Sequence, residues 1–149
     1  MRMYKVLALA LLIFSGCSEI LVKKPIPLDS GKTKIEVEYA EAGIYLVGTG
    51  AGSYYALPED REFIKVVCKI TNKSLFPRNL DLKELSLTDG KISSAPEFAF
   101  LFMTKDRVDA KKLEAKESVT LTVYFSWPKQ NRNIKLMHLE AGEMTISKQ

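Results

Sequence analysis

One stretch of the chain, residues 62–74, restricts the fold more than any other. Its side chains alternate with a period of two: one row is Ile64, Val66, Cys68 and Ile70, and the other is Lys65, Val67, Lys69 and Thr71. Such alternation places one row in a core and turns the other mostly outward, and β-branched residues suit a pleated sheet. Burial of each Ile or Val contributes about 1.5–3 kcal/mol. Because Asn72, Lys73 and Ser74 end the run with turn-forming residues, we predict a central β-strand here.

The length and composition indicate one globular domain. The 149 residues are enough for a single core, and 27% charged with 46% hydrophobic residues is an ordinary globular balance. Arg2 and Lys5 supply two charges of the formal net charge of +4, so the rest of the chain carries only +2. Its basic residues are scattered, which is typical of a solvated surface, and we expect no nucleic-acid partner.

The N-terminus has the three parts of a secretory signal peptide. Residues 1–5 carry two positive charges, residues 6–14 are apolar but too few to span a bilayer as a helix, and Ser15, Gly16 and Cys17 follow. The ending F-S-G-C resembles the lipobox of bacterial lipoproteins, with Phe14 where that family usually has Leu. The resemblance implies cleavage before Cys17, which would then carry a diacylglyceryl thioether and an N-acyl chain.

This resemblance also implies a cellular location and a domain organisation. Several acyl chains hold a protein stably on a membrane, so we expect a lipid-anchored protein of the bacterial cell envelope. Ser18 rather than Asp follows the cysteine, which by analogy with enteric bacteria favours the outer membrane facing the periplasm over the inner membrane. We expect a signal peptide at 1–16, the lipidated Cys17 with an extended, proline-containing tether at 17–31, and one domain at 32–149.

Turn signals separate several further runs that predict short strands: 33–39, 82–87, 97–103, 118–127, 133–139 and 144–146. Residues 97–103 carry Phe98, Phe100 and Phe102 in period two and are compatible with a buried strand or a buried helical turn. Gly43 is a candidate bulge in the apolar residues 42–47, and Asp89-Gly90 predicts a hairpin turn. Residues 104–117 are polar and compatible with one or two helical turns.

About seven short strands with turns between them predict a β-sandwich. The blocks F-I-K-V-V-C-K-I-T-N-K-S, L-S-L-T-D-G and L-E-A-K-E-S-V-T-L-T-V-Y-F-S-W-P resemble the immunoglobulin-like domains of secreted bacterial lipoproteins. Ala115-Lys116 stands where Pro-Gly is common in that family. The resemblance implies an all-β, immunoglobulin-like antiparallel β-sandwich of about seven strands, and it carries no general catalytic residues.

A glycine-rich stretch is the one candidate binding loop. It contains Gly48, Gly50 and Gly52, followed by Tyr54 and Tyr55. A phosphate-binding loop would need Gly-Lys-Ser/Thr, and a dinucleotide-binding loop would need a helix after the glycines; neither is present. Two interpretations remain. The stretch is a mobile loop before the central strand, or it is a binding loop whose glycines give mobility and whose tyrosines give contact area.

The residue types that usually carry catalysis or bind metals are few. His138 is the only histidine and shares a row with Ile134 and Leu136, so we expect it to be packed or hydrogen-bonded. Met137, His138 and Met144 are too few for a copper site. With Cys17 acylated no intramolecular disulfide can form, and Cys68 is expected to pack as a small apolar residue. We therefore expect no enzyme, no metal and no cofactor.

Two functions fit these observations. The leading hypothesis is a membrane-anchored, non-enzymatic β-sandwich that binds a protein partner in the cell envelope. The alternative is a small-ligand or glycan binder that uses the loop around Gly48–Tyr55 and Trp127, which lies at the core or at its rim.

Overall fold

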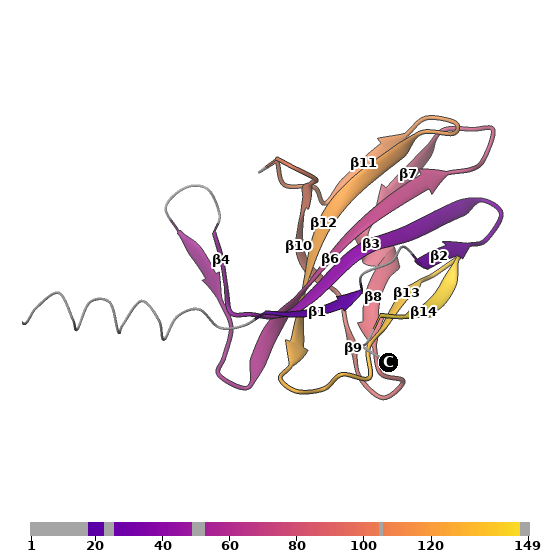
Figure 1. Cartoon of the computed structure of the whole chain (residues 1–149). Coiled ribbons are helices and arrows are strands. Elements are labelled where there is room, and N and C mark those ends of the chain that lie inside the picture. The colour runs from indigo at the N-terminus through magenta and orange to yellow at the C-terminus, as the bar shows by residue number, and fades with distance from the viewer. Residues whose placement is uncertain (1–17, 23–25, 49–52, 105, 147–149) are drawn as a thin grey trace, which may run out of the picture.

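The computed structural model describes residues 18–22, 26–48, 53–104 and 106–146, so the predicted signal peptide and Cys17 lie outside the described residues. Within these ranges the chain forms fourteen strands and one 3₁₀ turn (Figure 1). The predicted all-β antiparallel sandwich is confirmed. The elements are β1 (Glu19–Val22), β2 (Ile26–Asp29), β3 (Thr33–Ile44), β4 (Leu46–Gly48), β5 (Tyr54–Ala56), β6 (Arg61–Asn72), β7 (Arg78–Asp81), η1 (Leu82–Glu84), β8 (Leu85–Thr88), β9 (Ser93–Ser94), β10 (Pro96–Leu101), β11 (Ala110–Leu113), β12 (Ser118–Pro128), β13 (Lys135–His138) and β14 (Gly142–Thr145).

A six-stranded antiparallel sheet forms one layer, in the order β1-β3-β6-β12-β10, with β2 also paired to β3. The predicted central strand is β6, which pairs with β3 on one side and with β12 on the other. Its pairing with β12 runs without a break from Thr71↔Ser118 to Arg61↔Pro128. The expected inward row, Ile64, Val66, Cys68 and Ile70, is at most 1% exposed.

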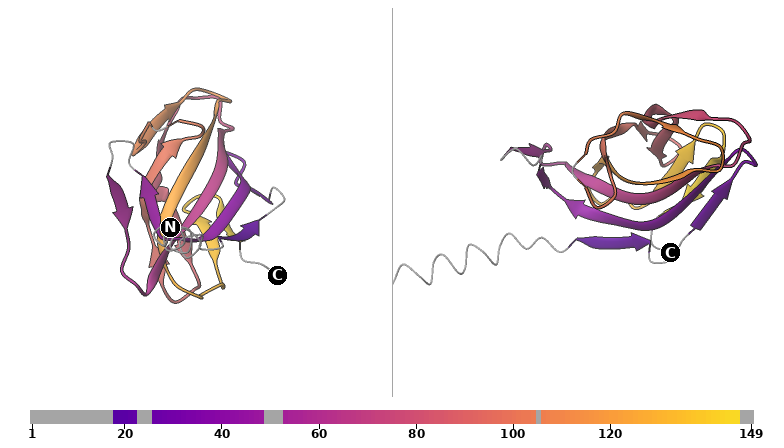
Figure 2. Two further views of the ribbon diagram at one scale, coloured as in Figure 1. Left: turned by 60° about the vertical axis from the view of Figure 1, so that its left-hand side comes forward. Right: turned by 90° about the horizontal axis from the view of Figure 1, so that it is seen from above.

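The second layer covers the inner face of the large sheet. It consists of a four-stranded sheet in the order β14-β13-β8-β9 and of the two-stranded pair β7-β11. In Figure 2 the large sheet curves as one layer, and β13 and β14 lie against its inner side. Trp127, Phe125, Leu87 and Leu136 fill the space between the layers. Trp127 therefore belongs to the core, where its indole N–H donates to the Asn131 carbonyl at 3.0 Å.

The expected tether at 17–31 is wrong for its described residues. β1 pairs with β3 through Glu19↔Ala42, and β2 pairs with β3 from Ile26↔Val37 to Asp29↔Lys34. Leu21 and Val22 are buried at 7% and 4% exposure, and this burial of apolar surface favours a bound strand over a free one. Pro27 is tolerated because β2 is an edge strand, where a missing N–H breaks no central ladder.

Residues 104–117, whose sequence is compatible with one or two helical turns, contain a strand instead. Ala110–Leu113 form β11, which pairs with β7 from Ala110↔Asp81 to Leu113↔Arg78. Val108 and Leu113 are buried in the main core: the ladder to β7 holds Leu113, and the Val108 N–H donates to the Ala99 carbonyl of β10 at 2.9 Å. The predicted turn at Asp89-Gly90 is confirmed: Gly90 has φ 92, and Asp89 Oδ1 accepts hydrogen bonds from the Lys91 and Ile92 N–H groups at 2.8 Å.

Candidate binding groove

The outer face of the large sheet, which points away from the second layer, carries its own aromatic cluster. Phe63 and Phe98 are buried there with Val47, although they lie outside the main core. Ring contacts join five residues, which we call the aromatic cluster: Tyr55, Phe63, Phe98, Phe100 and Tyr124. The Tyr55 and Phe98 rings stack with centroids 4.4 Å apart. This cluster builds one firm apolar wall on the outer face.

A groove of about 390 Å³ lies beside the aromatic cluster. Its floor comes from β6 and β12, and its walls come from β3 and from β10 with the turn that follows. The groove is lined by Glu38, Tyr39, Lys65, Val67, Phe100, Phe102, Met103, Thr104, Thr122 and Tyr124. Clefts of this size accept small ligands or short peptide segments, and aromatic side chains with a few polar groups are the usual lining.

A bulge in β3 turns Tyr39 into the groove. In strict alternation Tyr39 would share the inward row of Ile35 and Val37. The register of β3 against β6 shifts between Val37 and Tyr39, and the buried row continues instead at Ala40 and Ala42. Bulges commonly redirect a side chain in this way next to functional sites. The inserted residue therefore adds an aromatic ring to the outer face.

The turn after β10 presents two apolar side chains at the edge of the groove. Phe102 is 43% exposed, and Met103 is 86% exposed. The Thr104 N–H donates to the Leu101 carbonyl at 3.1 Å, which closes the turn and holds Met103 at φ 65. This left-handed conformation costs a residue with a side chain about 1–2 kcal/mol. Strained, exposed positions of this kind cluster at binding sites.

One ammonium group and two neutral phenols provide the polar chemistry nearby. Lys65 Nζ lies 3.6 Å from Glu41 Oε2 and 5.5 Å from the centroid of the Tyr39 ring. Burial raises the pKa of Tyr39, as does its hydrogen bond with Glu41. Burial also raises the pKa of Tyr124, and the charge of Glu41 adds to this effect. Both phenols stay neutral at pH 7, so the groove combines aromatic contact with neutral hydrogen-bonding groups and with the charges of Lys65 and Glu38.

Three residues of the predicted binding loop, Gly48, Tyr54 and Tyr55, are described, and the two tyrosines face opposite ways. Gly50 and Gly52 lie outside the described residues, and Gly48 ends β4, where it pairs with Tyr54 of β5. Tyr55 belongs to the aromatic cluster, and its hydroxyl accepts a hydrogen bond from Arg107 Nη1 at 3.2 Å. Tyr54 points outward and is 70% exposed. Of the three predicted residues that the structure describes, Tyr55 is the one built into the wall next to the groove.

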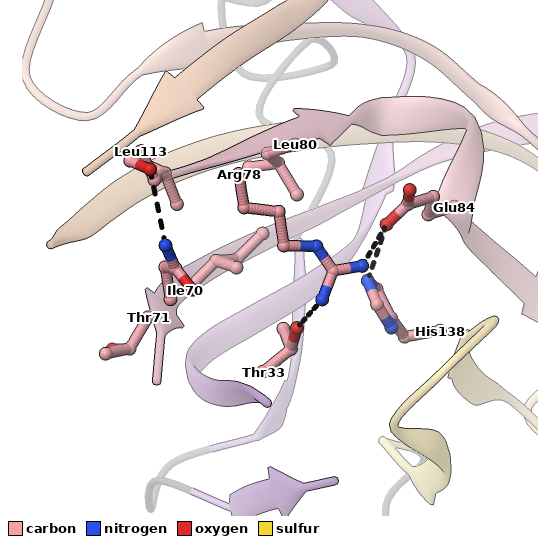
Figure 3. A pocket seen from close by; sticks show the side chains of 9 residues that line it. Thr33, Ile70, Thr71, Arg78, Leu80, Glu84, Leu113 and His138 are labelled. Atoms are coloured by element: carbon pink, nitrogen blue, oxygen red, sulfur yellow. Dashed lines mark hydrogen bonds and ion pairs between the residues drawn. The ribbon is translucent and has the colours of Figure 1, made fainter. Parts of the chain in front are cut away.

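A second cavity, between the layers, is lined by Arg78, Glu84 and His138 (Figure 3). Its volume is about 10 Å³, which is room for about one water molecule. Arg78 Nη1 donates to Thr33 Oγ1 at 2.7 Å and to Glu140 Oε2 at 2.5 Å. His138 Nδ1 accepts the N–H of Glu140 at 3.2 Å. This half-buried polar cluster joins β3, β7 and β13, and the cavity beside it is too small for a ligand.

The fold lowers the pKa of His138, which favours the neutral imidazole at pH 7. Its Nε2 lies 3.2 Å from Glu84 Oε2, but neither atom makes a hydrogen bond of good geometry. Burial lowers the pKa of His138 below its ordinary value of 6.5; Glu84 opposes this shift, and Arg78 adds to it. The expectation of a packed histidine is confirmed, since His138 is 1% exposed.

This arrangement predicts how stability depends on pH. Because the pKa of His138 is lower in the folded state, the unfolded chain binds the proton more readily. The contribution of His138 to the free energy of unfolding is complete above pH 6.5 and is lost as the pH falls below that value. We expect the free energy of unfolding, measured by urea titration, to decrease from pH 7 towards pH 5.5. His138→Gln should flatten the curve in this window, and an unchanged slope would contradict the assignment, because His138 is the only histidine.

Cys68 is not a reactive thiol. Burial raises its pKa to about 12, and the charge of Glu38 adds to the shift. The thiol is 1% exposed and packs in the main core, as predicted. Within the described residues, no group of three or more His, Cys, Asp or Glu side chains is placed to hold a metal ion. Over the same part of the chain, no helix is long and apolar enough to cross a membrane.

The sequence shows some of the rows of side chains that line the groove, but it does not predict that these rows lie side by side. The period-two row of Phe98, Phe100 and Phe102 and the row of Thr122 and Tyr124 are visible in the sequence. Their juxtaposition follows from the pairing of β10 with β12, in which Phe100 lies opposite Thr122. Tyr39 and Met103 carry no such signal, because a bulge and a left-handed turn set their directions.

Comparison with known proteins gives the fold. No family model matches the sequence, and no curated protein matches it. An uncharacterized β-sandwich protein from Clostridium difficile 630 aligns with 82% of this chain and 87% of its own, with 12% identity and a TM-score of 0.54. A functionally unknown protein from Listeria monocytogenes EGD-e aligns over 82% and 76%, with 11% identity and a TM-score of 0.51.

A third solved structure, a "putative lipoprotein" (ycdA) from Bacillus subtilis subsp. subtilis str. 168, is also similar. The alignment covers 83% of this chain and 39% of that one, with 12% identity and a TM-score of 0.56. This chain therefore matches less than half of the Bacillus protein. At such low identities the likeness shows the fold alone, and the chain is an antiparallel β-sandwich protein similar to these three.

Proposed function

We propose that the protein is a lipid-anchored lipoprotein of the bacterial cell envelope, with an immunoglobulin-like β-sandwich that binds a protein partner and is not an enzyme. The observation that carries the proposal is the groove on the outer face of the large sheet. Phe102 and Met103 stand exposed at its edge, on a strained turn. Apolar side chains that are exposed to solvent on a strained backbone turn are typical of an interaction surface.

The composition of the groove favours a protein partner. Aromatic residues and Met are enriched at protein interfaces, and they supply most of the binding energy when a polar rim surrounds them. Here Phe100, Phe102 and Met103 form the apolar part. Lys65 and Glu38 provide charges of both signs at the groove, which would fix the orientation of a bound segment.

The sequence supports the anchor. The charged start, the apolar stretch and the F-S-G-C ending place Cys17 at the expected acylation site. A solved protein of similar fold is described as a "putative lipoprotein", which agrees with an envelope location. Anchoring would keep the groove close to membrane partners and would raise their effective concentration.

The anchor is tested with the wild-type protein and a Cys17→Ser variant, each carrying a C-terminal tag. We expect the wild type in the membrane fraction, with an N-terminal peptide whose mass shows an acylated Cys17. The variant should lack this modification and leave the membrane fraction after mild washing. An unmodified cysteine in the wild type would overturn the proposed anchor.

The partner is tested by crosslinking and pull-down from native membranes, with the wild type and Cys17→Ser side by side. We expect a discrete partner to be captured by the wild type and lost or strongly reduced with the unanchored variant. An empty pull-down from a wild type that remains in the membrane fraction would count against a protein partner.

Such a result would favour the alternative function, a small-ligand or glycan binder. The volume of the groove, about 390 Å³, is in the range of ligand clefts. The structure changes the residues that would serve it, since Tyr124 and Tyr39 line the groove whereas Tyr54 does not. Tyr54→Ala should then leave ligand binding intact, and Phe100→Ala should reduce it. The reverse pattern would indicate that the ligand binds at the loop around Gly48–Tyr55 instead of in the groove.

A further inference from the structure

The β4–β5 hairpin has one face packed on the sandwich and one face open. Val47 and Tyr55 are paired and face the aromatic cluster. Leu46 and Tyr54 point the other way, with exposed fractions of 58% and 70%. Tyr45, at the entry to the hairpin, is 45% exposed, and Lys129 Nζ lies 4.7 Å from the centroid of its ring. We call Tyr45, Leu46 and Tyr54 the hairpin face.

The first described strand begins at the same end of the molecule. β1 runs antiparallel to β3, and its first residue, Glu19, pairs with Ala42, close to the point where β3 ends and the hairpin begins. Figure 1 shows β1 starting on the side from which the hairpin projects. Arg132 Nε donates to Glu19 Oε2 at 2.8 Å and also contacts Glu62, which fixes the start of β1 to the start of β6.

The distance along the chain from this point to the proposed acylation site is short. Cys17 precedes Glu19 by two residues. Two residues span at most about 7 Å, even when fully extended. A lipid anchor at Cys17 would therefore hold the hairpin end of the sandwich against the bilayer surface, because β1 leaves no length for a free tether.

We propose that the hairpin face lies in the lipid headgroup region and acts as a second, non-covalent contact with the membrane. This proposal rests on the proposed lipid anchor at Cys17. Tyrosine favours the membrane interface because its ring is apolar and its hydroxyl stays hydrated. The Lys129 ammonium group lies over the Tyr45 ring, and its flexible stem would let it reach the headgroups next to the hairpin face.

The charges at this end predict that the contact is mainly apolar. Lys129 is a cation next to the hairpin face, but the exposed Glu59 and Asp60 lie in the adjoining turn, where the Lys129 N–H donates to the Asp60 carbonyl. These carboxylates oppose attraction to anionic lipids. We therefore expect contact with phosphatidylethanolamine as well as phosphatidylglycerol surfaces, with little dependence on salt.

A fluorescence measurement on the acylated, full-length mature protein tests this contact. Tyr54→Cys carries an environment-sensitive probe on the hairpin face, and Phe76→Cys carries it in the β6–β7 loop, where the native residue is 75% exposed. The thiol of Cys68 is buried and does not compete for the label. Both proteins are placed on phosphatidylethanolamine–phosphatidylglycerol vesicles that contain brominated acyl chains.

We expect the probe at position 54 to shift to shorter wavelength and to be quenched several-fold, while the probe at position 76 stays unchanged. Co-flotation with the vesicles and the mass of the N-terminal peptide report on the anchor separately. Protein that floats with an unquenched probe at position 54 would overturn the hairpin contact and leave the anchor standing. Equal quenching at both positions would also overturn it. Protein that does not float would remove the anchor and the contact together.

Discussion

Arg132→Met is expected to lower the free energy of unfolding by about 3 kcal/mol, measured by urea titration at pH 7. The side chain of Glu62 is 2% exposed, and Arg132 donates a hydrogen bond to its carboxylate. Methionine keeps most of the apolar stem but leaves the buried carboxylate without its cationic partner. The cost lies at the lower end of the range for a broken buried pair, because Arg132 is 29% exposed and water can partly replace it.

A second substitution separates charge from packing. Adding Glu62→Gln to Arg132→Met removes the unpaired charge, and the double variant should recover at least half of the lost stability. Glu19→Gln is the matched control, because its contact with Arg132 is at the surface, with 34% exposure, and exposed ion pairs contribute about 0–1 kcal/mol. A cost below about 1 kcal/mol for Arg132→Met would contradict the role given to this pair.

Phe102→Ser combined with Met103→Ser is expected to weaken binding of the protein partner about 100-fold, which corresponds to about 2.7 kcal/mol. The two side chains form the exposed apolar edge of the groove. Because Met103 is 86% exposed and Phe102 is only partly covered, the melting temperature should change little. The affinity is measured by titration of the purified, captured partner against the wild type and the double variant.

Leu75→Ser with Phe76→Ser is the matched control. These two residues are also adjacent and apolar, with exposed fractions of 76% and 75%, but they lie in the β6–β7 loop rather than at the groove. We expect their replacement to leave the affinity unchanged. If the control pair weakened binding and the groove pair did not, the partner surface would lie at that loop.

Period-two alternation predicts β6 and β12 well, because each of these long strands buries one complete row. The β6 row from Ile64 to Ile70 and the β12 row of Val119, Leu121, Val123 and Phe125 are buried as expected. The Asp89-Gly90 turn is equally local, since an aspartate that caps its own loop and a glycine at φ 92 suffice to define it. These features are predictable because they depend on residues that are close together in the sequence.

The errors arise where pairing with a distant strand decides the structure. β1 and β11 have only four residues each, which is too short for a clear period. β1 becomes a strand because the long strand β3 offers it backbone hydrogen bonds. β11 becomes a strand because the short strand β7 does the same. The expectation of a free tether failed for this reason, and residues 104–117, which the sequence leaves open to helical turns, contain a strand.

The candidate site was only partly predictable. The sequence pointed to Tyr55, which the structure places in the aromatic cluster, but it joined Tyr55 with Tyr54, which faces the opposite way. The groove itself depends on the bulge at β3 and on the turn at Met103, and neither leaves a pattern in the alternation. Cys17, Gly50 and Gly52 lie outside the described residues, so the predictions for them remain predictions.

The central claim is that the groove on the outer face of the large sheet binds a protein partner. The most direct measurement places a photo-crosslinking amino acid at Phe102 in the anchored protein, in intact cells, with the same replacement at Phe76 as the reference. We expect one discrete crosslinked species from position 102 and none from position 76. A partner crosslinked from position 76 alone, or no product from position 102 in a protein that is folded and anchored, would contradict it.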